Sequence, residues 1–293
     1  NAIHLSVKTC RFLAKNLKTT KGKFVLKIFE NADSDYIQYQ IKLMRIATKN
    51  NLPVPKNITT NSGEEIFIYN NKNLIIQEFV KGKKPKKMNK QLIKDMANKQ
   101  ALLDKELMKI KLQGKYTWGK DYQFRYIEFK VKKYRNFNIR NEEKTILKEL
   151  KKIDRKKLRR SNIHADFHTV NLLVENNKIK AILDWDDAHE DYLIYDLVAS
   201  LTFDFITDKR IYGDKIKLYL REFEKIIKLN SEEKKAMYYF FKYRYLQAIA
   251  WHVIQKDKHK DRKKDINSRI KYMISLYKNF NKISLEEFME MVK

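Results

Sequence analysis

Four polar side chains between residues 161 and 200 have the types and the spacing that phosphoryl transfer needs. His164, Asp166 and Asn171 form the pattern H-x-D-x-x-x-x-N, and Asp184 follows. Amide and carboxylate oxygens are the ligands that a hard divalent cation prefers, and a carboxylate such as Asp166, held beside a metal-bound phosphate, is what a phosphoryl transferase requires. Each residue alone would be an ordinary turn former or a structural histidine. The four in this order predict a site, provided that the surrounding elements bring them together.

A β-hairpin is the element that would bring the oxygen ligands together. Two apolar runs, 172–174 and 179–183, are separated by the polar residues 175–178, which is typical of two strands joined by a turn. Asn171 precedes the first strand and Asp184 ends the second. The hairpin therefore predicts that both side chains face one point in space.

The segment after the hairpin is predicted to support the loop before it. Residues 191–205 have the pattern of a helix, and Asp196 lies inside an otherwise apolar turn of it. A buried carboxylate needs hydrogen-bond partners. We expect backbone amides of the preceding loop to supply them, which would give Asp196 a structural role.

A lysine lies inside a predicted strand near the start of the chain. Residues 10–17 and 23–29 have the pattern of two strands joined by a turn at 19–22, and Lys27 stands between two apolar residues of the second strand. Two interpretations are open. Lys27 reaches the phosphates of a nucleotide, or it points to water from an edge strand.

The remaining elements change from mixed to helical along the chain. A helix over 35–49 and a hairpin over 66–79 complete the N-terminal part, and the composition changes at about residue 82 to a lysine-rich connection. We place the domain boundary there, between residues 1–82 and 83–293. Further helices are predicted at 90–111, 122–134, 142–153, 215–227, 231–254, 269–280 and 285–291. The predicted fold class is therefore α+β.

Composition limits the class of protein. The hydrophobic share of 43% is that of a folded protein, and no apolar run approaches the ~20 residues that a membrane-spanning helix needs. The single cysteine, Cys10, excludes an internal disulfide framework and favours a reducing compartment such as the cytoplasm. The net charge of +28 suggests nucleic acid, but the lysines are spread along the chain without interleaved aromatic residues. We expect no membrane partner, and we favour lysine-rich solvated faces over a dedicated nucleic-acid site, which is kept as a less favoured alternative.

The motifs together resemble one enzyme superfamily. IHADFHTVNLLV, AILDWDDA and YDLVAS, with VLKI, LPVP and QEFVKG before them, are similar to the aminoglycoside phosphotransferase, homoserine kinase and choline kinase superfamily. The resemblance covers nearly the whole chain, and the helical tail is most similar in pattern to the homoserine-kinase-like branch. It implies a protein-kinase-like bilobal fold: a nucleotide-binding lobe, 1–82, with a small antiparallel sheet and one helix, and a larger, mostly helical catalytic and acceptor-binding lobe, 83–293.

The resemblance also implies roles for matching residues and an ATP- and Mg²⁺-dependent reaction. Asp166 would be the catalytic base that receives the proton of the acceptor hydroxyl, and His164 would brace its loop. Asn171 and Asp184 would hold Mg²⁺ on the ATP phosphates. The nucleotide would be bound by the side chain of Lys27 and by the backbone of the hinge that runs from Glu78 to Val80.

Two departures from the family pattern concern the residues that would bind the nucleotide. The helix after Lys27 usually supplies a glutamate to hold that lysine, and Gln40 stands there instead. The loop before the first strand, SVKT, has no glycine, so that Ser6 and Thr9 would add hydroxyl donors to its backbone amides. Both departures favour a second hypothesis slightly, a non-catalytic nucleotide-binding scaffold of the same fold, against which the retained Asp166, Asn171 and Asp184 argue.

The acceptor is the least determined part of the prediction. Arg244, Gln247 and Trp251 could share one face of a late helix and form a polar-aromatic wall for a polar metabolite. A homoserine-like amino alcohol fits the tail, and an aminoglycoside would need a local acidic patch. A choline- or ethanolamine-type acceptor would need an aromatic cage. The candidates for that cage are Tyr238, Tyr239, Tyr243, Tyr245 and Trp251.

Overall fold

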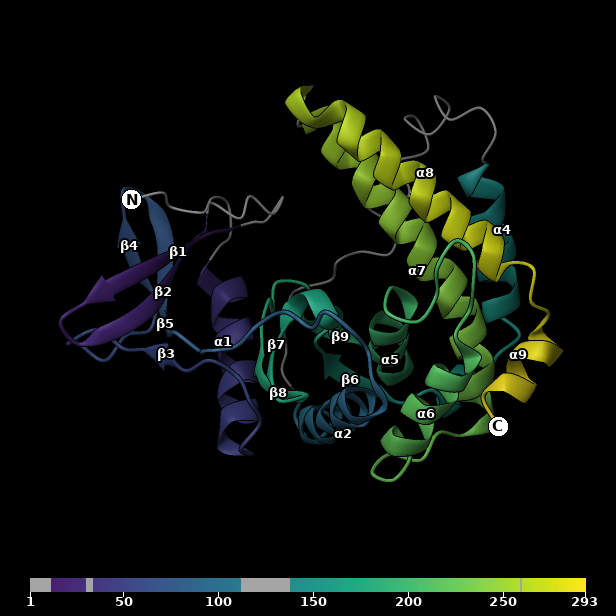
Figure 1. The fold of residues 1–293 in the computed structure, drawn as a ribbon, viewed down its shortest axis with the longest axis horizontal. Helices are drawn as coiled ribbons and strands as arrows, with labels where there is room; N and C mark the ends of the chain where they lie inside the picture. The colour runs from purple at the N-terminus through teal and green to yellow at the C-terminus, as the bar shows by residue number, and fades with distance from the viewer. Residues whose placement is uncertain (1–11, 30–33, 112–137, 259) are drawn as a thin grey trace.

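A small antiparallel sheet with one helix lies beside a larger, mostly helical part, which confirms the predicted α+β class (Figure 1). The computed structural model describes residues 12–29, 34–111, 138–258 and 260–293. The helix predicted over 122–134 and the first residues of the strand predicted over 10–17 lie outside the described residues. The boundary predicted at residue 82 stays a prediction.

The N-terminal part is a sheet of five strands in the order β1-β2-β5-β3, with β4 also paired to β5. Its elements are β1 (Phe12–Thr19), β2 (Gly22–Phe29), α1 (Ser34–Lys49), β3 (Asn57–Ile58), β4 (Phe67–Tyr69) and β5 (Lys72–Glu78). The predicted turn between the first two strands is confirmed, because Thr19 pairs with Gly22. Gly22 has a φ of 127°, which favours glycine. Asn70 and Asn71, both in the left-handed region, join β4 to β5.

Lys27 lies on a central strand and is buried. Strand β2 pairs with β1 on one side and β5 on the other, and Lys27 is 7% exposed. Side chains alternate along a strand, so Lys27 shares a face with Phe29, which packs on Ile37 and Ile41 of α1. The interpretation of Lys27 as a water-facing edge lysine is therefore wrong.

The C-terminal part consists of helices around two short two-stranded ladders, β6-β9 and β7-β8. Its elements are α2 (Lys90–Leu107), α4 (Ile139–Leu150), the 3₁₀ turn η1 (Arg155–Lys157), β6 (Arg160–Ile163), the 3₁₀ turn η2 (Thr169–Asn171), β7 (Leu172–Glu175), β8 (Lys178–Ile182), β9 (His189–Tyr192), α5 (Leu193–Thr202), α6 (Gly213–Phe223), α7 (Ser231–Lys258), the 3₁₀ turn η3 (Lys260–Arg262), α8 (Lys263–Phe280) and α9 (Leu285–Met291). The predicted hairpin is confirmed as β7-β8. The predicted helix over 191–205 is wrong at its start, because its first two residues belong to β9, which pairs with β6.

The core of this part surrounds α5, every residue of which is buried. Helices α7 and α8 lie side by side as a long pair (Figure 1). Contacts also cross to the sheet side. The Ile182 amide donates to Pro53 O at 2.7 Å, and the Tyr39 hydroxyl of α1 donates to Asn162 Oδ1 of β6 at 2.8 Å. Helix α1 is thereby held directly against the strand that leads into the predicted site.

The chain between the sheet and α2 is also held against the hairpin. The backbones of Lys83 and Val174 exchange two hydrogen bonds, at 3.0 and 2.8 Å. At Gly82, an added Cβ atom would lie 2.9 Å from Leu173 Cβ, so the close approach of the two backbones requires glycine. Strand β7, which follows Asn171, is therefore fixed through this crossing to the chain that follows Glu78 of β5.

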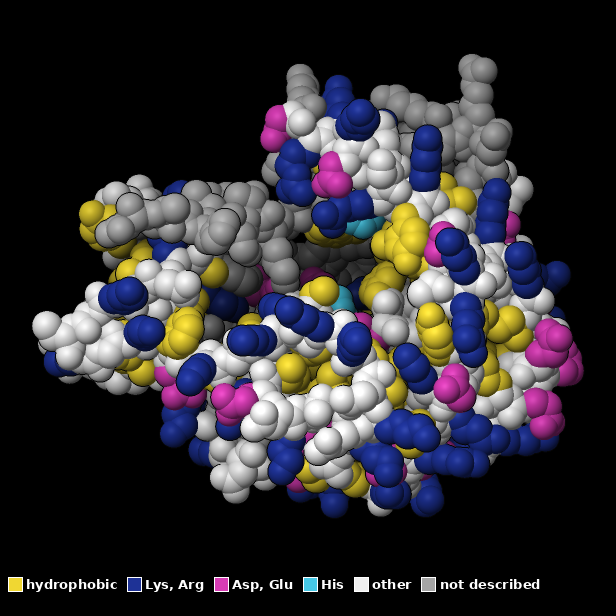
Figure 2. Space-filling model, viewed as in Figure 1, with side chains coloured by type: hydrophobic (Ala, Val, Ile, Leu, Met, Phe, Trp, Pro, Cys, Tyr) yellow, Lys and Arg dark blue, Asp and Glu magenta, His cyan; other side chains and the backbone are white. Residues whose placement is uncertain are grey.

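Lysine and arginine side chains are scattered over the face shown in Figure 2, and a hollow lies between the sheet side and the helical side. Across the described ranges, every helix is either too short or too polar to cross a membrane.

Candidate active site

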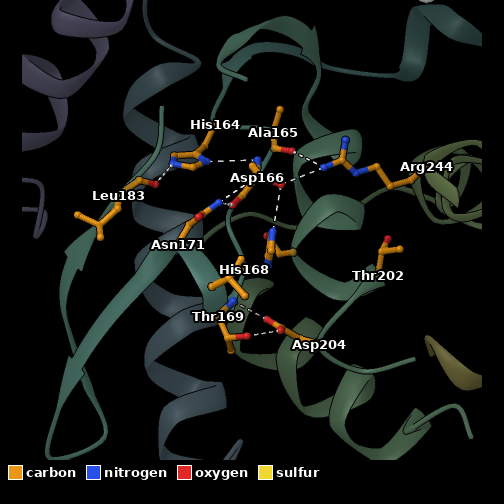
Figure 3. A network of polar contacts seen from close by, with 12 residues as sticks. His164, Ala165, Asp166, His168, Thr169, Asn171, Leu183, Thr202, Asp204 and Arg244 are labelled. Carbon is orange, nitrogen blue, oxygen red and sulfur yellow. Dashed lines mark hydrogen bonds and ion pairs between the residues drawn. The ribbon is translucent and has the colours of Figure 1, made fainter. Parts of the chain in front are cut away.

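A short loop between β6 and β7 carries three of the four residues of the sequence pattern (Figure 3). His164 is fully buried and lies between two backbone groups. Its Nδ1 is 3.2 Å from the Asp166 amide, which donates to it, so Nε2 carries the hydrogen and donates to Leu183 O at 3.1 Å. Burial lowers the pKa of His164, against the raising effect of nearby carboxylates. A neutral histidine thus ties the loop to the end of β8, which agrees with the bracing role that the family resemblance implies.

The Asp166 carboxylate accepts hydrogen bonds from three side chains. His168 Nε2 and Arg244 Nη2 lie 3.1 and 3.0 Å from Oδ1, and Asn171 Nδ2 lies 2.5 Å from Oδ2. Burial would raise the pKa of Asp166, but His168 and Arg244 hold it below its usual range. The same carboxylate raises the pKa of His168 against the opposite effect of burial. Asp166 is therefore an ionised, oriented carboxylate.

Ala165, immediately before Asp166, has a strained backbone that is held on both sides. Its φ is 63°, in the left-handed region where an alanine costs about 1 kcal/mol or more. Its amide donates to Asp196 Oδ1 at 2.5 Å, and its carbonyl accepts from Arg244 Nη2 at 3.3 Å. The expectation that Asp196 bonds a backbone amide of the loop is confirmed.

Asn171 and Asp184 lie at the two open ends of the hairpin, as predicted. Leu172 pairs with Ile182, and the Leu183 amide donates to Asn171 O at 2.8 Å, which places Asp184 one residue from that contact. Asp184 has a φ of 64°, so the chain turns sharply there. The Asn171 amide nitrogen is used on Asp166, which leaves its oxygen as the atom that could ligate a metal.

The donor set fits a hard cation that also binds phosphate oxygens. Nowhere in the described ranges do three His, Cys, Asp or Glu side chains form a group that could hold a metal. One amide oxygen and one carboxylate from the protein leave most coordination positions to a nucleotide and water, which is how Mg²⁺ is usually held. The residues present therefore fit Mg²⁺ with ATP.

The residues of the sheet side that are predicted to bind the nucleotide make few hydrogen bonds with the described part of the protein. Gln40 is 2% exposed on α1, and its Nε2 finds no acceptor among the described residues. Glu78 donates its amide to Lys56 O at 2.9 Å. Val80 is half-buried, and no backbone hydrogen bond within the described residues involves it. Ser6 and Thr9 lie outside the described residues.

The late helix α7 brings Arg244 into the site, and sequence reasoning missed its contact with Asp166. The guanidinium lies over the rings of Tyr195 and Phe203, 5.9 and 5.8 Å from their centroids, and Nη1 donates to the Tyr195 hydroxyl at 3.3 Å. Gln247 bonds the same hydroxyl. Arg244 and Gln247, about one turn apart on α7, thus meet at the Tyr195 hydroxyl, and the acceptor-binding wall expected of them with Trp251 stays a prediction.

The tyrosines proposed for an aromatic cage are used in the core instead. Tyr238 donates to Ile283 O at 2.7 Å and packs on Phe280. Tyr245 donates to Thr202 O at 3.2 Å and is fully buried. Tyr243 is also buried in this core, whereas Tyr239 is half-buried and lies edge-on to Tyr238. Tyr238, Tyr243 and Tyr245 are therefore core residues rather than the walls of a cage for a quaternary ammonium group.

Asp204 also supports the loop, and the sequence pattern gave little sign of it. Its carboxylate accepts from the Thr169 amide at 2.9 Å and from the Thr169 hydroxyl at 2.6 Å, which caps the turn that contains Asn171. The only signal was a carboxylate between two phenylalanines after α5. Burial raises the pKa of Asp204, and the Thr169 hydrogen bonds oppose that shift.

The fold and the loop together define a small-molecule phosphotransferase with protein-kinase-like architecture. The chain belongs to the phosphotransferase enzyme family, whose family model matches residues 11–227. Solved structures of such enzymes share its fold at low identity. An amicoumacin kinase in complex with AMP-PNP and Ca²⁺ is 15% identical, with a TM-score of 0.75 over 97% of this chain and 89% of that one.

Two further structures are similar over nearly the whole chain. A microcompartment-associated aminopropanol kinase is 14% identical, with a TM-score of 0.72, and the match covers 99% of this chain and 94% of that chain. The ethanolamine kinase of Plasmodium vivax is 12% identical, with a TM-score of 0.61, covering 99% and 83%. At such identities the likeness shows the shared fold.

Proposed function

We propose that this protein transfers the terminal phosphoryl group of ATP to a hydroxyl group of a small molecule, in a Mg²⁺-dependent reaction. The observation that carries the proposal is the Asp166 carboxylate, half-buried, ionised and fixed beside Asn171. Phosphoryl transfer depends on alignment and on neutralising phosphate oxygens rather than on a covalent protein intermediate. A base fixed next to a candidate metal ligand matches that requirement.

Each candidate residue has a separate task in this reaction. Asp166 accepts the proton of the acceptor hydroxyl while that oxygen bonds to phosphorus and the bond to the ADP oxygen breaks. Asn171 Oδ1 and the Asp184 carboxylate would hold Mg²⁺, which when bound neutralises charge on the phosphate oxygens. Lys27 would contact the α- and β-phosphates, with Gln40 beside it. The backbone from Glu78 to Val80 would bind the adenine.

A polar acceptor is favoured by the wall of the site. Arg244 and Gln247 are both bonded to the Tyr195 hydroxyl, which gives a polar surface next to Asp166. We infer an amino alcohol of the homoserine-kinase-like type or an aminoglycoside-like polyol as the acceptor. A choline-type acceptor is less favoured, because Tyr238, Tyr243 and Tyr245, three of the tyrosines that could have formed a cage, belong to the core.

The test is ADP release with Mg²⁺ and a panel of hydroxylated acceptors: homoserine, ethanolamine, 1-amino-2-propanol, choline and an aminoglycoside. Removal of the base in Asp166→Ala should lower acceptor-dependent turnover by about 10³-fold and leave nucleotide affinity largely intact. Asp208→Ala is the control, because Asp208 is exposed and has no hydrogen bond or ion pair within the described residues. Equal activity of Asp166→Ala and wild type would remove the base assignment. Nucleotide binding without turnover on any acceptor would favour the scaffold.

A further inference from the structure

The two oxygens of the Asp166 carboxylate are not equivalent, and this difference deepens the proposed function, on which the inference rests. An ionised carboxylate has about four lone-pair positions, two on each oxygen. Oδ1 already accepts from two donors, His168 Nε2 and Arg244 Nη2. Oδ2 accepts from one, Asn171 Nδ2. Among the described residues, the position that remains open is therefore on Oδ2, the oxygen next to the candidate metal ligand.

Arg244 is the donor that completes Oδ1, and its own position is fixed from several sides. It lies between the rings of Tyr195 and Phe203 and bonds the Tyr195 hydroxyl. One nitrogen, Nη2, contacts both Asp166 Oδ1 and the carbonyl of the strained Ala165. A planar guanidinium with a fixed fork of donors can hold two such acceptors, and a lysine ammonium on its flexible stem fits this geometry less well.

The arginine is poorly explained by the needs of the fold alone. Its Nε is buried and has no acceptor among the described residues. A buried donor without a partner is costly, so a residue selected only for stability would avoid it. The arrangement is better explained by the need to place Nη2 at Oδ1.

We propose that Arg244 is a positioning residue for the base: by filling the second lone-pair position of Asp166 Oδ1, it directs the acceptor hydroxyl to Oδ2. The proton of the acceptor then moves to Oδ2 while the acceptor oxygen bonds to phosphorus and the bond from phosphorus to the ADP oxygen breaks. Helix α7, which carries Arg244, thereby connects the wall of the acceptor site to the base.

Loss of Arg244 should therefore lower turnover, while nucleotide affinity and thermal stability change little. In Arg244→Met, Oδ1 gains an open position, and a hydroxyl or a water can bond there out of line with the phosphate. We expect kcat for acceptor phosphorylation to fall by about 10²-fold, because a misplaced reacting group costs on that order. ATP hydrolysis to water should fall far less, so that the ratio of hydrolysis to transfer rises about tenfold. Nucleotide Kd should change less than about twofold, because Arg244 has no assigned nucleotide contact.

The experiment compares wild type, Arg244→Met, Arg244→Lys and the control Arg269→Gln, which removes an exposed arginine paired only with Asp265. The measurements are ADP release with and without each acceptor of the panel, nucleotide Kd, Tm and a crystal structure of Arg244→Met with ADP. Arg244→Lys should recover part of kcat. The structure should show the Asp166 carboxylate rotated from its present contacts, while Tm stays within a few degrees of wild type.

Two results would overturn the inference while the proposed function stands. One is an unchanged kcat in Arg244→Met. The other is a fall of transfer and hydrolysis in equal proportion, together with a lower Tm and an unrotated carboxylate, which would make Arg244 a structural residue. Different results would contradict the proposed function itself. These are equal activity of Asp166→Ala and wild type, or no ADP release by wild type with any acceptor. The inference about Arg244 would then fail as well.

Discussion

The loop around Asp166 and the sheet side of the molecule differ in how their polar side chains are satisfied. In the loop, His164 and Asp166 are bonded by neighbours on the same loop, and Asp196 holds the backbone from behind. On the sheet side, the buried Gln40 Nε2 has no acceptor among the described residues, and the Val80 backbone makes no hydrogen bond there.

This difference indicates which half of the reaction the protein organises by itself. A base that must be aligned to a fraction of an ångström benefits from being fixed before substrate arrives. Donors that meet a nucleotide need a partner only when it is bound, and a buried donor without one costs about 1–3 kcal/mol. We infer that the catalytic loop is preorganised, whereas the sheet side is completed by its ligand.

The largest effect that tests this comparison is expected at Asp184. Asp184→Asn keeps an oxygen ligand and loses its charge, so turnover should fall by about 10²-fold or more and the Mg²⁺ requirement should move to higher concentration. The measurement is a Mg²⁺ titration of ADP release for the variant, wild type and the exposed control Asp208→Asn. If the variant and wild type give superimposable curves, Asp184 has no part in the metal site.

A smaller effect is expected on the sheet side, where Lys27 and Gln40 should act together. Lys27→Met should raise KM for ATP about tenfold, a loss of about 1.4 kcal/mol. Gln40→Glu should lower KM about threefold, because a carboxylate can pair with the lysine more strongly than an amide can.

The double variant makes this prediction sharper. If Gln40 acts through Lys27, the benefit of Gln40→Glu should vanish or reverse when Lys27 is methionine, since the carboxylate would then be buried without its cation. Independent, additive effects on KM would show that the two side chains do not interact.

The sequence was sufficient where contacts are local. His164, Asp166 and Asn171 contact one another within a single loop, and the hairpin is closed by Asn176 and Asn177, both in the left-handed region that asparagine tolerates. Short-range spacing and turn chemistry therefore predicted most of the loop, and the family resemblance implied the bracing role of its histidine.

Contacts between distant parts of the chain could not be predicted in the same way. Arg244 meets Asp166 because α7 packs on α5. The helical spacing of Arg244 indicated which side of the helix it lies on, but not that this side contacts Asp166. Strands β6 and β9 are four residues each and lack a clear alternation, so their pairing depends on tertiary context. The same is true of Asp204, which reaches Thr169 from beyond α5.

The smallest expected effect concerns Asp104 of α2, which lies behind the preorganised loop. Asp104 is fully buried. Burial raises its pKa well above the usual range, and the charge of Asp196 raises it further. A carboxyl whose pKa is raised in the folded state contributes most to stability below its unfolded pKa, and this contribution is lost as pH rises towards the folded value.

Asp104→Asn has nearly the same shape and is neutral at every pH. Its Tm should equal that of wild type at about pH 4, near the unfolded pKa of an aspartate, and should exceed it by a few degrees above pH 7. Turnover should change less than about threefold, because the side chain and the backbone amide that donate to Asp196 belong to Gln100 and Ala165, and neither oxygen of Asp104 has a hydrogen-bond partner among the described residues. Thermal unfolding between pH 4 and 9, with Asp208→Asn as the control, measures the difference. A gap in Tm that stays constant across this range would mean that Asp104 is already ionised in the folded protein, beside the carboxylate of Asp196, to which Gln100 donates at 3.3 Å.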